Sequence, residues 1–460
     1  MIKNKWFLIA LIFPILISSF YILFSPGKIK SDAAEYDGLA NSILEGKYEL
    51  NGKPSMEREP GYPFFRAILK TLSKNEKFIL FVQLILYLLT IIIIAKTFEK
   101  VDKNLILWAL FGASLSYALA FYPSTHLSET FSAFLLSIFG YLLITAIDNP
   151  IKKYRIYLSI ISSAIVLTRY PYMLIPIVFI IILSTSSLKK NFPKKIILKN
   201  ILISISILTI LVMPWIIRNY VKFQQIQMAG RSGAGLYARA WKAEHSWRSL
   251  GDSYLSSILG RGILYTVYPN NQSIWLDQWG DWWRDEKTIK TIWGDNPVTI
   301  DQNRKEKAMS IIFSNFNTFS KFVIWSGVDD IRFLQLQNPI PEAQGSPFEG
   351  TYGPLAKEKG LNKLQLTGLL IANLIQLIWL ILIPISMYIG FKKYGIRFVP
   401  GILLIPILLI HSLADNIPRY GAPLQPWLLS AIFITILPPL LIKVKSIYEK
   451  RISNISNTGL

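Results

Sequence analysis

Long runs of apolar residues alternate with short polar connections along this chain of 460 residues. Several runs reach the roughly 18 residues that an α-helix needs to cross the hydrocarbon core of a bilayer. We place membrane-spanning helices at 6–24, 78–95, 104–122, 127–147, 156–169, 171–184, 201–217, 364–390, 398–414 and 423–442. The pattern predicts an all-α polytopic membrane protein with about ten transmembrane helices.

The fifth and sixth of these ranges, 156–169 and 171–184, are shorter than a full span. Short apolar segments of this kind fit a hairpin that dips below the membrane surface and lines a cavity, where irregular backbone is shielded from lipid. Arg169 lies between the two segments. We therefore expect Arg169 near the membrane surface.

Two polar connections are long enough to carry structure of their own. The first, 25–77, has apolar residues at helical spacing within YDGLANSILEG (36–46). The second, 218–363, is long enough for a small folded domain, which we expect to be of mixed α or α/β character. The predicted parts are an N-terminal transmembrane module with its first loop, a loop domain, and C-terminal transmembrane helices with a tail: 1–217, 218–363 and 364–460.

The charge distribution predicts how the chain is oriented. The net charge is +21, and the short connections on one side of the predicted spans hold 20 Lys or Arg against 4 Asp or Glu. The first long loop, on the opposite side, holds 9 basic and 8 acidic residues. This asymmetry follows the positive-inside rule and places both long loops outside the cytoplasm. The positive charge then marks topology and attraction to anionic membrane lipid, and we expect no nucleic-acid partner. The chain has no cysteine, which excludes disulfides and thiolate metal sites.

Acids and arginines gather at the extracytoplasmic ends of the predicted helices. Ionisable groups near a membrane are costly and indicate function by default. Arginine can grip a phosphate bidentately, and a carboxylate can take a proton from an incoming hydroxyl. Such a set suits a lipid-linked phosphosugar, and the Trp-rich second loop could stack on a sugar ring. The residues are Asp32, Glu35, Arg58, Glu59, His126, Glu129, Arg169, Arg218 and Arg419.

Each of these residues also has a structural interpretation. Asp32 fits a helix N-cap, and Glu35, three residues later, fits its capping-box partner. Arg58 can pair with a neighbouring loop acid, and the other arginines can be interfacial side chains with buried stems. His126 and Glu129 share a helix face. With only two other histidines in the chain, a metal pair there has less support than Glu129 as an orienting acid.

A series of short motifs resembles the GT-C superfamily of polyprenyl-phosphate-dependent glycosyltransferases, in particular the branch of protein O-mannosyltransferases and lipid A aminoarabinose transferases. An acid stands in the first loop, in SDAAEYDGLA, and an R-x-PGYP element follows as REPGYP (58–63). A TE-like element, here SET, opens a later span. The second loop is preceded by PWIIRN (214–219), and the glycine-rich stretch GRSGAGLY (230–237) follows that motif. RYGAPLQP (419–426) completes a resemblance that runs from about 25 to 430.

The resemblance implies a hexosyl- or pentosyltransferase. Its donor would be a polyprenyl-phosphate sugar, its acceptor the hydroxyl of a glycan, lipid or protein, and the transfer would invert the anomeric centre. It implies an integral, multi-pass protein of the bacterial plasma membrane with the active site facing outside. No nucleotide cofactor and no obligatory metal are implied.

The implied site residues fall into three groups. Asp32 and Glu35 would be catalytic, and Arg58, Arg218 and Arg419 would bind the donor phosphate. From their places in the sequence we add Glu129, Arg169, Tyr62 and His126 as residues that would orient the acceptor or another site residue. Many members place a second acid beside the first, whereas here the next acid is three residues away. This departure leaves open whether Asp32 acts alone and whether a divalent metal binds.

Two alternative functions share the predicted topology. A polymerase or ligase that joins long lipid-linked glycans would use a diphosphate donor. A transporter or flippase would show discontinuous spans with polar groups near the middle of the bilayer, often in repeated halves. Because the polar residues gather on one face and the sequence shows no internal repeat, transport is the less favoured alternative.

Overall fold

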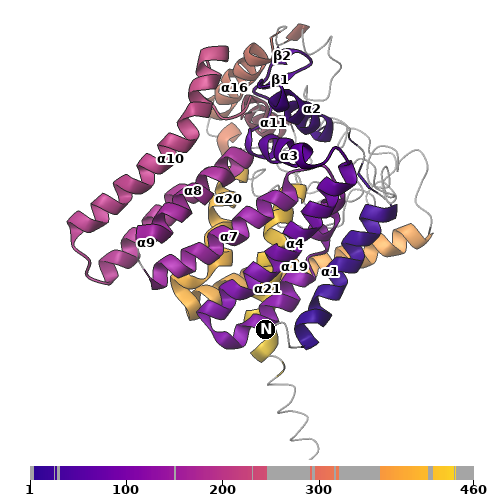
Figure 1. Cartoon of the computed structure of the whole chain (residues 1–460), viewed down its shortest axis with the longest axis vertical. Coiled ribbons are helices and arrows are strands. Elements are labelled where there is room, and N and C mark those ends of the chain that lie inside the picture. Colours follow the sequence, from indigo (N-terminus) through magenta and orange to yellow (C-terminus); the bar gives the residue numbers. More distant parts are fainter. Residues whose placement is uncertain are drawn as a thin grey trace, which may run out of the picture.

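The computed structural model is a bundle of long helices with a group of short elements at one end (Figure 1). It describes residues 5–24, 26–27, 29, 32–149, 152–230, 232–245, 291–292, 296–314, 317–320, 363–412, 418–439 and 441. Each of the ten apolar ranges predicted from the sequence coincides with helix. These helices are α1 (Lys5–Phe24), α4 (Glu76–Val101), α5 (Ile106–Ser114) with α6 (Tyr117–Phe121), α7 (Glu129–Asp148), α8 (Lys152–Thr168), α9 (Ile175–Lys189), α10 (Lys194–Phe223), α19 (Lys363–Tyr394), α20 (Val399–Ser412) and α21 (Gln425–Thr435).

The all-α polytopic class is confirmed. Among the described residues, six helices are long and apolar enough to cross a membrane, or seven if a bent pair is counted as one span. The pair is Lys103–Ser114 and Tyr117–Ser124, which meet at 56°. The total of ten spans stays a prediction.

The sixth apolar segment is longer than the sequence indicated. The helical stretch runs through Tyr170–Lys189, a full 20 residues, so its interpretation as half of a short hairpin is wrong. The helix continues through the polar run STSS because the hydroxyls donate to carbonyl oxygens one turn back. Ser184 Oγ donates to the Ile180 carbonyl at 2.6 Å, and Ser187 Oγ donates to the Leu183 carbonyl at 2.7 Å. Such internal bonds satisfy the hydroxyl without a water partner.

The break between α5 and α6 is held by one buried glutamine. A break inside a membrane helix leaves backbone N–H groups that must find partners within the protein. Gln425 Oε1 accepts from the Ala118 N–H at 2.7 Å and from the Ser116 hydroxyl at 3.0 Å. A residue of the RYGAPLQP element therefore stabilises a bend some three hundred residues earlier in the chain.

The core of the bundle lies around α7 and the stretch Gly421–Pro439, which contains α21, and 72% and 78% of their most apolar windows are buried. At one edge of the bundle stands α10, with only 11% of its window buried (Figure 1). Its long apolar sides suit contact with lipid. The helix starts at 194 and runs to 223, so it crosses the boundary predicted between 217 and 218 without interruption.

The elements at one end of the bundle come from both predicted loops (Figure 1). The first loop supplies α2 (Asp32–Leu44), which confirms the helix expected there, and α3 (Gly61–Leu72). Between them, β1 (Glu49–Leu50) pairs antiparallel with β2 (Lys53–Pro54), with Glu49 opposite Pro54. The turn is Asn51–Gly52, both with positive φ, the usual signal for a tight hairpin.

The described part of the second loop is helical. It contains α11 (Ser232–His245), which packs against α16 (Pro297–Phe313) through a small apolar core that includes Tyr237 and Ile311. The division at 218 and 363, and an α/β character for this region, stay predictions. The tryptophans of the stretch 275–293 lie outside the described residues.

Candidate active site

Two acids in the first turn of α2 share one buried arginine. Arg58 is 8% exposed, and its Nε donates to Glu35 Oε2 at 2.6 Å while Nη2 pairs with Asp32 Oδ1. The carboxylate side chains of Asp32 and Glu35 keep 23% and 28% exposure, so they remain accessible. Of the roles that the sequence left open for Arg58, pairing with loop acids is the one that this geometry shows.

The surroundings of Arg58 keep it charged. Burial alone would lower the pKa of Arg58, but the neighbouring Tyr36, Asp32 and Glu35 raise that pKa well above its ordinary value. The guanidinium also lies 5.1 Å from the centre of the Tyr36 ring, within range of a cation–π contact. The cluster of two carboxylates and one guanidinium therefore has a net charge of −1 when all three groups are ionised.

The PGYP element positions Arg58 by a close helix contact. Gly61 starts α3, and a Cβ there would lie 2.5 Å from Thr168 Oγ1 and 2.9 Å from the Leu167 carbonyl carbon, so only glycine permits this approach to α8. Glu59 Oε1 accepts from the Tyr170 N–H at 2.8 Å across the same contact. The first loop is thereby fixed against the end of α8.

Tyr62 is a fully buried packing residue. Its ring meets the Tyr36 ring edge to face, with centroids 4.9 Å apart, and its hydroxyl donates to Gln83 Oε1 at 3.3 Å. Burial is the main cause that raises the pKa of Tyr62, so it stays neutral. The structure places Tyr62 between α2, α3 and α4 rather than at an open surface.

A second acid–arginine pair lies beside the first. Glu129, in the first turn of α7, and Arg169, just before the short helix η3 (Tyr170–Tyr172), are 1% and 8% exposed. Glu129 Oε1 and Arg169 Nη1 are 3.3 Å apart. The two pairs are linked through their neighbours in the chain, because the Tyr170 N–H donates to Glu59 Oε1 at 2.8 Å. The orienting roles of Glu129 and Arg169 stay predictions.

Arg218, near the end of α10, fixes the hairpin of the first loop. Its Nη1 donates to the Ser55 carbonyl at 2.6 Å, and its Nη2 donates to the Tyr48 carbonyl at 3.0 Å. The Tyr48 hydroxyl in turn donates to the Arg58 carbonyl at 2.9 Å. Within the described residues, no carboxylate lies within salt-bridge distance of Arg218, unlike Arg58 and Arg169. Tyr48 therefore connects Arg218 to the segment of Arg58 by hydrogen bonds to both residues.

Arg419 belongs to the short helix η7 (Pro418–Leu424). Its side chain lies outside the part of the chain that the structure describes, and its predicted contact with a donor phosphate stays a prediction. Among the described residues, no group of three or more histidine, aspartate or glutamate side chains is arranged to hold a metal ion.

A second charged network, which the sequence did not indicate, surrounds His126. Arg66 is fully buried and contacts His126 Nδ1 at 2.8 Å, Glu76 Oε2 at 3.0 Å and the Asp37 carboxylate. Lys70 pairs with the same two acids. Burial would raise the pKa of Asp37, but hydrogen bonds from Lys70 and Arg66 hold that pKa below its ordinary value. The network ties α2, α3 and α4 together, and His126 belongs to it rather than to the Asp32 cluster.

No protein-family model matches the chain, and no curated protein matches its sequence significantly. The fold is similar to that of the archaeal oligosaccharyltransferase AglB from Archaeoglobus fulgidus, solved with an inhibitory peptide and a dolichol-phosphate (TM-score 0.49, 13% identity, 97% of this chain). The chain spans about half of that protein, 52% of its length.

The fold is also similar to that of ArnT from Cupriavidus metallidurans. In the apo state the TM-score is 0.40 at 10% identity, over 95% of this chain and 78% of ArnT. With undecaprenyl phosphate bound, the TM-score is 0.37 at 12% identity, over 95% and 79%.

The buried position of His126 predicts a specific loss of stability in acid. Burial, followed by the charge of Arg66, lowers the pKa of His126 from its ordinary value of 6.5 to about 4. As the pH falls, His126 is protonated in the unfolded chain before it is protonated in the folded protein. The contribution of neutral His126 to the free energy of unfolding is therefore complete above about pH 6.5 and is lost between pH 6.5 and 4. We expect the wild type to lose about 2–3 kcal/mol more than His126→Gln between pH 7 and pH 4.5.

The measurement is the free energy of unfolding of both proteins in detergent at the two pH values. Glutamine can still accept from Arg66, and the carboxylates titrate in both proteins, so the difference isolates the imidazole. Equal losses in the two proteins would contradict the prediction.

Proposed function

We propose that the protein is a membrane glycosyltransferase that moves a sugar from a polyprenyl-phosphate donor to an acceptor hydroxyl, with inversion, at the extracytoplasmic face. One observation carries the proposal: the Asp32–Arg58–Glu35 cluster and the Glu129–Arg169 pair lie on segments that are joined by the hydrogen bond from the Tyr170 N–H to Glu59 at one end of the helices. The headgroup of a lipid-linked donor lies at that depth while its tail stays in the hydrocarbon.

The arrangement of charges suggests a division of roles. Asp32 takes the proton from the acceptor hydroxyl as its oxygen forms a bond to the anomeric carbon. On the opposite face of the sugar, the bond between the anomeric carbon and the phosphate oxygen breaks, and the polyprenyl phosphate leaves with the electron pair. Because the Arg58 guanidinium already holds two carboxylates, we assign it to positioning Asp32 and Glu35 rather than to the phosphate.

The developing phosphate charge needs cations without neutralising partners. Arg218 fits this requirement, since two of its five N–H donors have no acceptor among the described residues. Arg419 is the second candidate from the sequence motif. Arg169 is paired with Glu129 and does not meet this requirement, so we assign it to orientation rather than to the phosphate.

Neutralising Arg218 is expected to weaken donor binding. Charge-assisted hydrogen bonds contribute about 1.5–3 kcal/mol, so Arg218→Gln should raise the dissociation constant of a polyprenyl-phosphate sugar roughly 10- to 100-fold. Glutamine can still donate to the Ser55 carbonyl, which preserves part of the anchor of the hairpin. The measurement is equilibrium binding of the donor to purified protein, with the melting temperature followed in parallel. Unchanged donor affinity would remove Arg218 from the phosphate site.

The function is tested with purified protein in lipid nanodiscs. A panel of polyprenyl-phosphate hexoses and pentoses is offered beside the matching diphosphates, and release of the lipid carrier is measured. Turnover of a monophosphate donor supports the proposal, and turnover of diphosphates alone would favour a polymerase or ligase. Movement of intact donor between leaflets with no bond broken would favour a transporter and would overturn the proposed reaction.

A further inference from the structure

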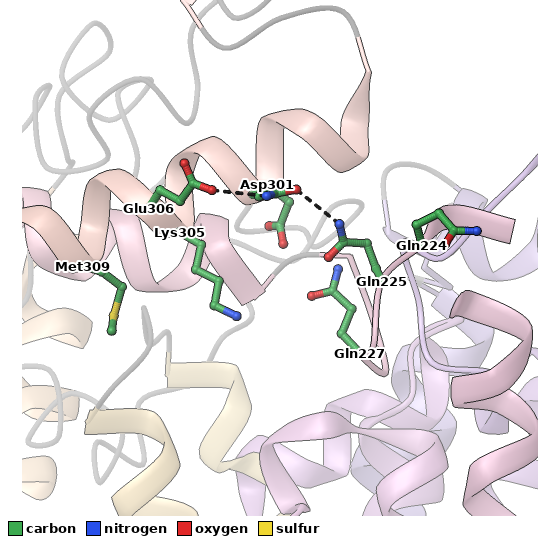
Figure 2. A pocket seen from close by; sticks show the side chains of 8 residues that line it. Gln224, Gln225, Gln227, Asp301, Lys305, Glu306 and Met309 are labelled. Carbon is green, nitrogen blue, oxygen red and sulfur yellow. Dashed lines mark hydrogen bonds between the residues drawn. The ribbon is translucent and has the colours of Figure 1, made fainter. Parts of the chain in front are cut away.

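An open groove lies between the end of α10 and the helix α16 (Figure 2). Its volume is about 730 Å³, within the range of roughly 300–1,000 Å³ that is usual for ligand sites. Side chains from both elements face it, and none of them belongs to the catalytic cluster described above. The polar groups that matter here are Gln224, Gln225, Gln227, Asp301, Gln302 and Glu306.

Carboxamides dominate the polar lining of the groove. Gln225 Nε2 donates to Gln302 Oε1 at 3.3 Å, and Gln302 Nε2 donates to Glu306 Oε1 at 3.2 Å, which forms a ladder along one wall (Figure 2). Each carboxamide offers two donor hydrogens and an acceptor oxygen, so the ladder can match a ligand that both donates and accepts. Hydroxyl groups have this property.

The charge of the groove disfavours an anionic ligand. Asp301 and Glu306 face it together with one cation, Lys305, which gives a net charge of −1. Asp301 is only 4% exposed, and its Oδ1 accepts from the Ala234 N–H at 3.0 Å, which fixes α16 to the start of α11. A phosphate or carboxylate ligand would lie beside these acids, whereas a neutral ligand would not be repelled.

The backbone at Gln224 supports a role for its side chain. Gln224 ends α10 in the left-handed region, with φ 58° and ψ 30°, a position where glycine is the usual residue. A residue with a side chain is strained there by about 1 kcal/mol. Because the Gln224 side chain lines the groove, the strained residue presents a carboxamide that glycine could not provide.

The groove lies next to the candidate active site. The Gly230 N–H donates to the Met56 carbonyl at 2.7 Å, and Asn219 Nδ2 donates to the Gln227 carbonyl at 2.9 Å. The segment that carries the glutamines is therefore bound to the first loop two residues from Arg58.

We propose that this groove binds a neutral, hydroxyl-rich glycan. Because the groove lies beside the first loop, which carries Arg58, we assign this glycan as the acceptor. This assignment rests on the proposed glycosyl transfer. The ladder of carboxamides would hold the sugar hydroxyls, and the reacting hydroxyl would extend past Glu57 toward Asp32.

The test measures binding without turnover. Wild-type protein in nanodiscs is titrated with neutral tri- and tetrasaccharides of glucose, mannose, galactose and rhamnose, with a sulfated chondroitin tetrasaccharide and with an unglycosylated Ala/Ser peptide. We expect neutral oligosaccharides to bind, and the double variant Gln225→Ala/Gln302→Ala to weaken that binding at least about tenfold, since two hydrogen-bonding side chains are lost. Lys305→Ala should weaken binding, and the matched control Lys307→Ala, on the same helix but outside the groove, should not.

Gln224→Gly separates binding from folding. Glycine suits the left-handed backbone, so the melting temperature should stay equal or rise while glycan binding weakens. Equal glycan affinity in wild type, Gln224→Gly and the double variant would overturn the assignment of the groove. Preference for the sulfated saccharide or for the peptide, or no binding by the neutral panel, would also overturn it.

The two proposals can fail separately. If neutral glycans bind in the groove but no lipid-linked donor is turned over, the glycosyl-transfer proposal fails and the binding site stands. If a donor is turned over and the groove variants transfer and bind like the wild type, the groove assignment alone fails.

Discussion

Replacing Asp32 with asparagine should lower the turnover number by about 10²–10⁴-fold while donor affinity stays within about twofold of the wild type. A positioned general base contributes roughly this factor, and an amide cannot take the proton of the acceptor hydroxyl. Asparagine keeps the shape of aspartate and an oxygen that can accept from Arg58 Nη2, so the loop should keep its structure. The measurements are steady-state transfer from a polyprenyl-phosphate sugar and equilibrium donor binding.

Two further acids on α2 or just after it provide the comparison. Glu45→Gln changes an exposed acid that follows α2 and should leave turnover unaltered. Glu35→Gln changes the other partner of Arg58 and should reduce turnover less than Asp32→Asn if Asp32 is the base. Wild-type turnover by Asp32→Asn would disprove the assignment, and a larger loss for Glu35→Gln would move it to Glu35.

Replacing Arg66 with methionine should destabilise the protein by about 3–5 kcal/mol. The side chain is fully buried and contacts the Asp37 and Glu76 carboxylates and His126 Nδ1. Methionine leaves two carboxylates with one cation, Lys70, so one negative charge in this network loses its compensation, which accounts for the size of the effect. The measurement is the free energy of unfolding in detergent, or the melting temperature where unfolding is irreversible.

Lys70→Met is the matched control for Arg66. Lys70 pairs with the same two acids, but its side chain is 12% exposed and its charge lies nearer to solvent. We expect a smaller loss of stability, because the carboxylates keep Arg66 and water can reach the altered site. Equal losses for the two variants, or none for Arg66→Met, would show that the buried position of Arg66 is not decisive.

Most of the bundle could be predicted from the apolar pattern, because each long helix must satisfy its own backbone within the membrane. The helix α2 and the pairing alternative for Arg58 were also visible in the sequence. The hairpin of β1 and β2 was missed although Asn51–Gly52 signals it. The extent of the Tyr170–Lys189 span was missed because its hydroxyls bond back to their own helix, which hydropathy does not register.

The arrangement of the site could be predicted only in part. The motifs separated Asp32 and Glu35, as catalytic residues, from Arg58, as a phosphate-binding residue, whereas in the structure Arg58 pairs with both acids. The partners of Arg66 lie 29, 10 and 60 residues away along the chain, in α2, in α4 and in the connection before α7. No local spacing encodes such pairings, since they depend on how α2, α3 and α4 pack. For the same reason His126 seemed to belong with Glu129 at helical spacing, whereas packing turns it toward Arg66.

Because Gly61 has no side chain, the start of α3 lies directly against Leu167 and Thr168 of α8. Any side chain at this position would clash with Leu167 and Thr168 and push the start of α3 away from α8. Arg58 lies just before this contact and Arg66 just after it, so both charged assemblies would shift together. Transfer of this loop to another helical bundle would therefore also require transfer of the end of α8 that it contacts.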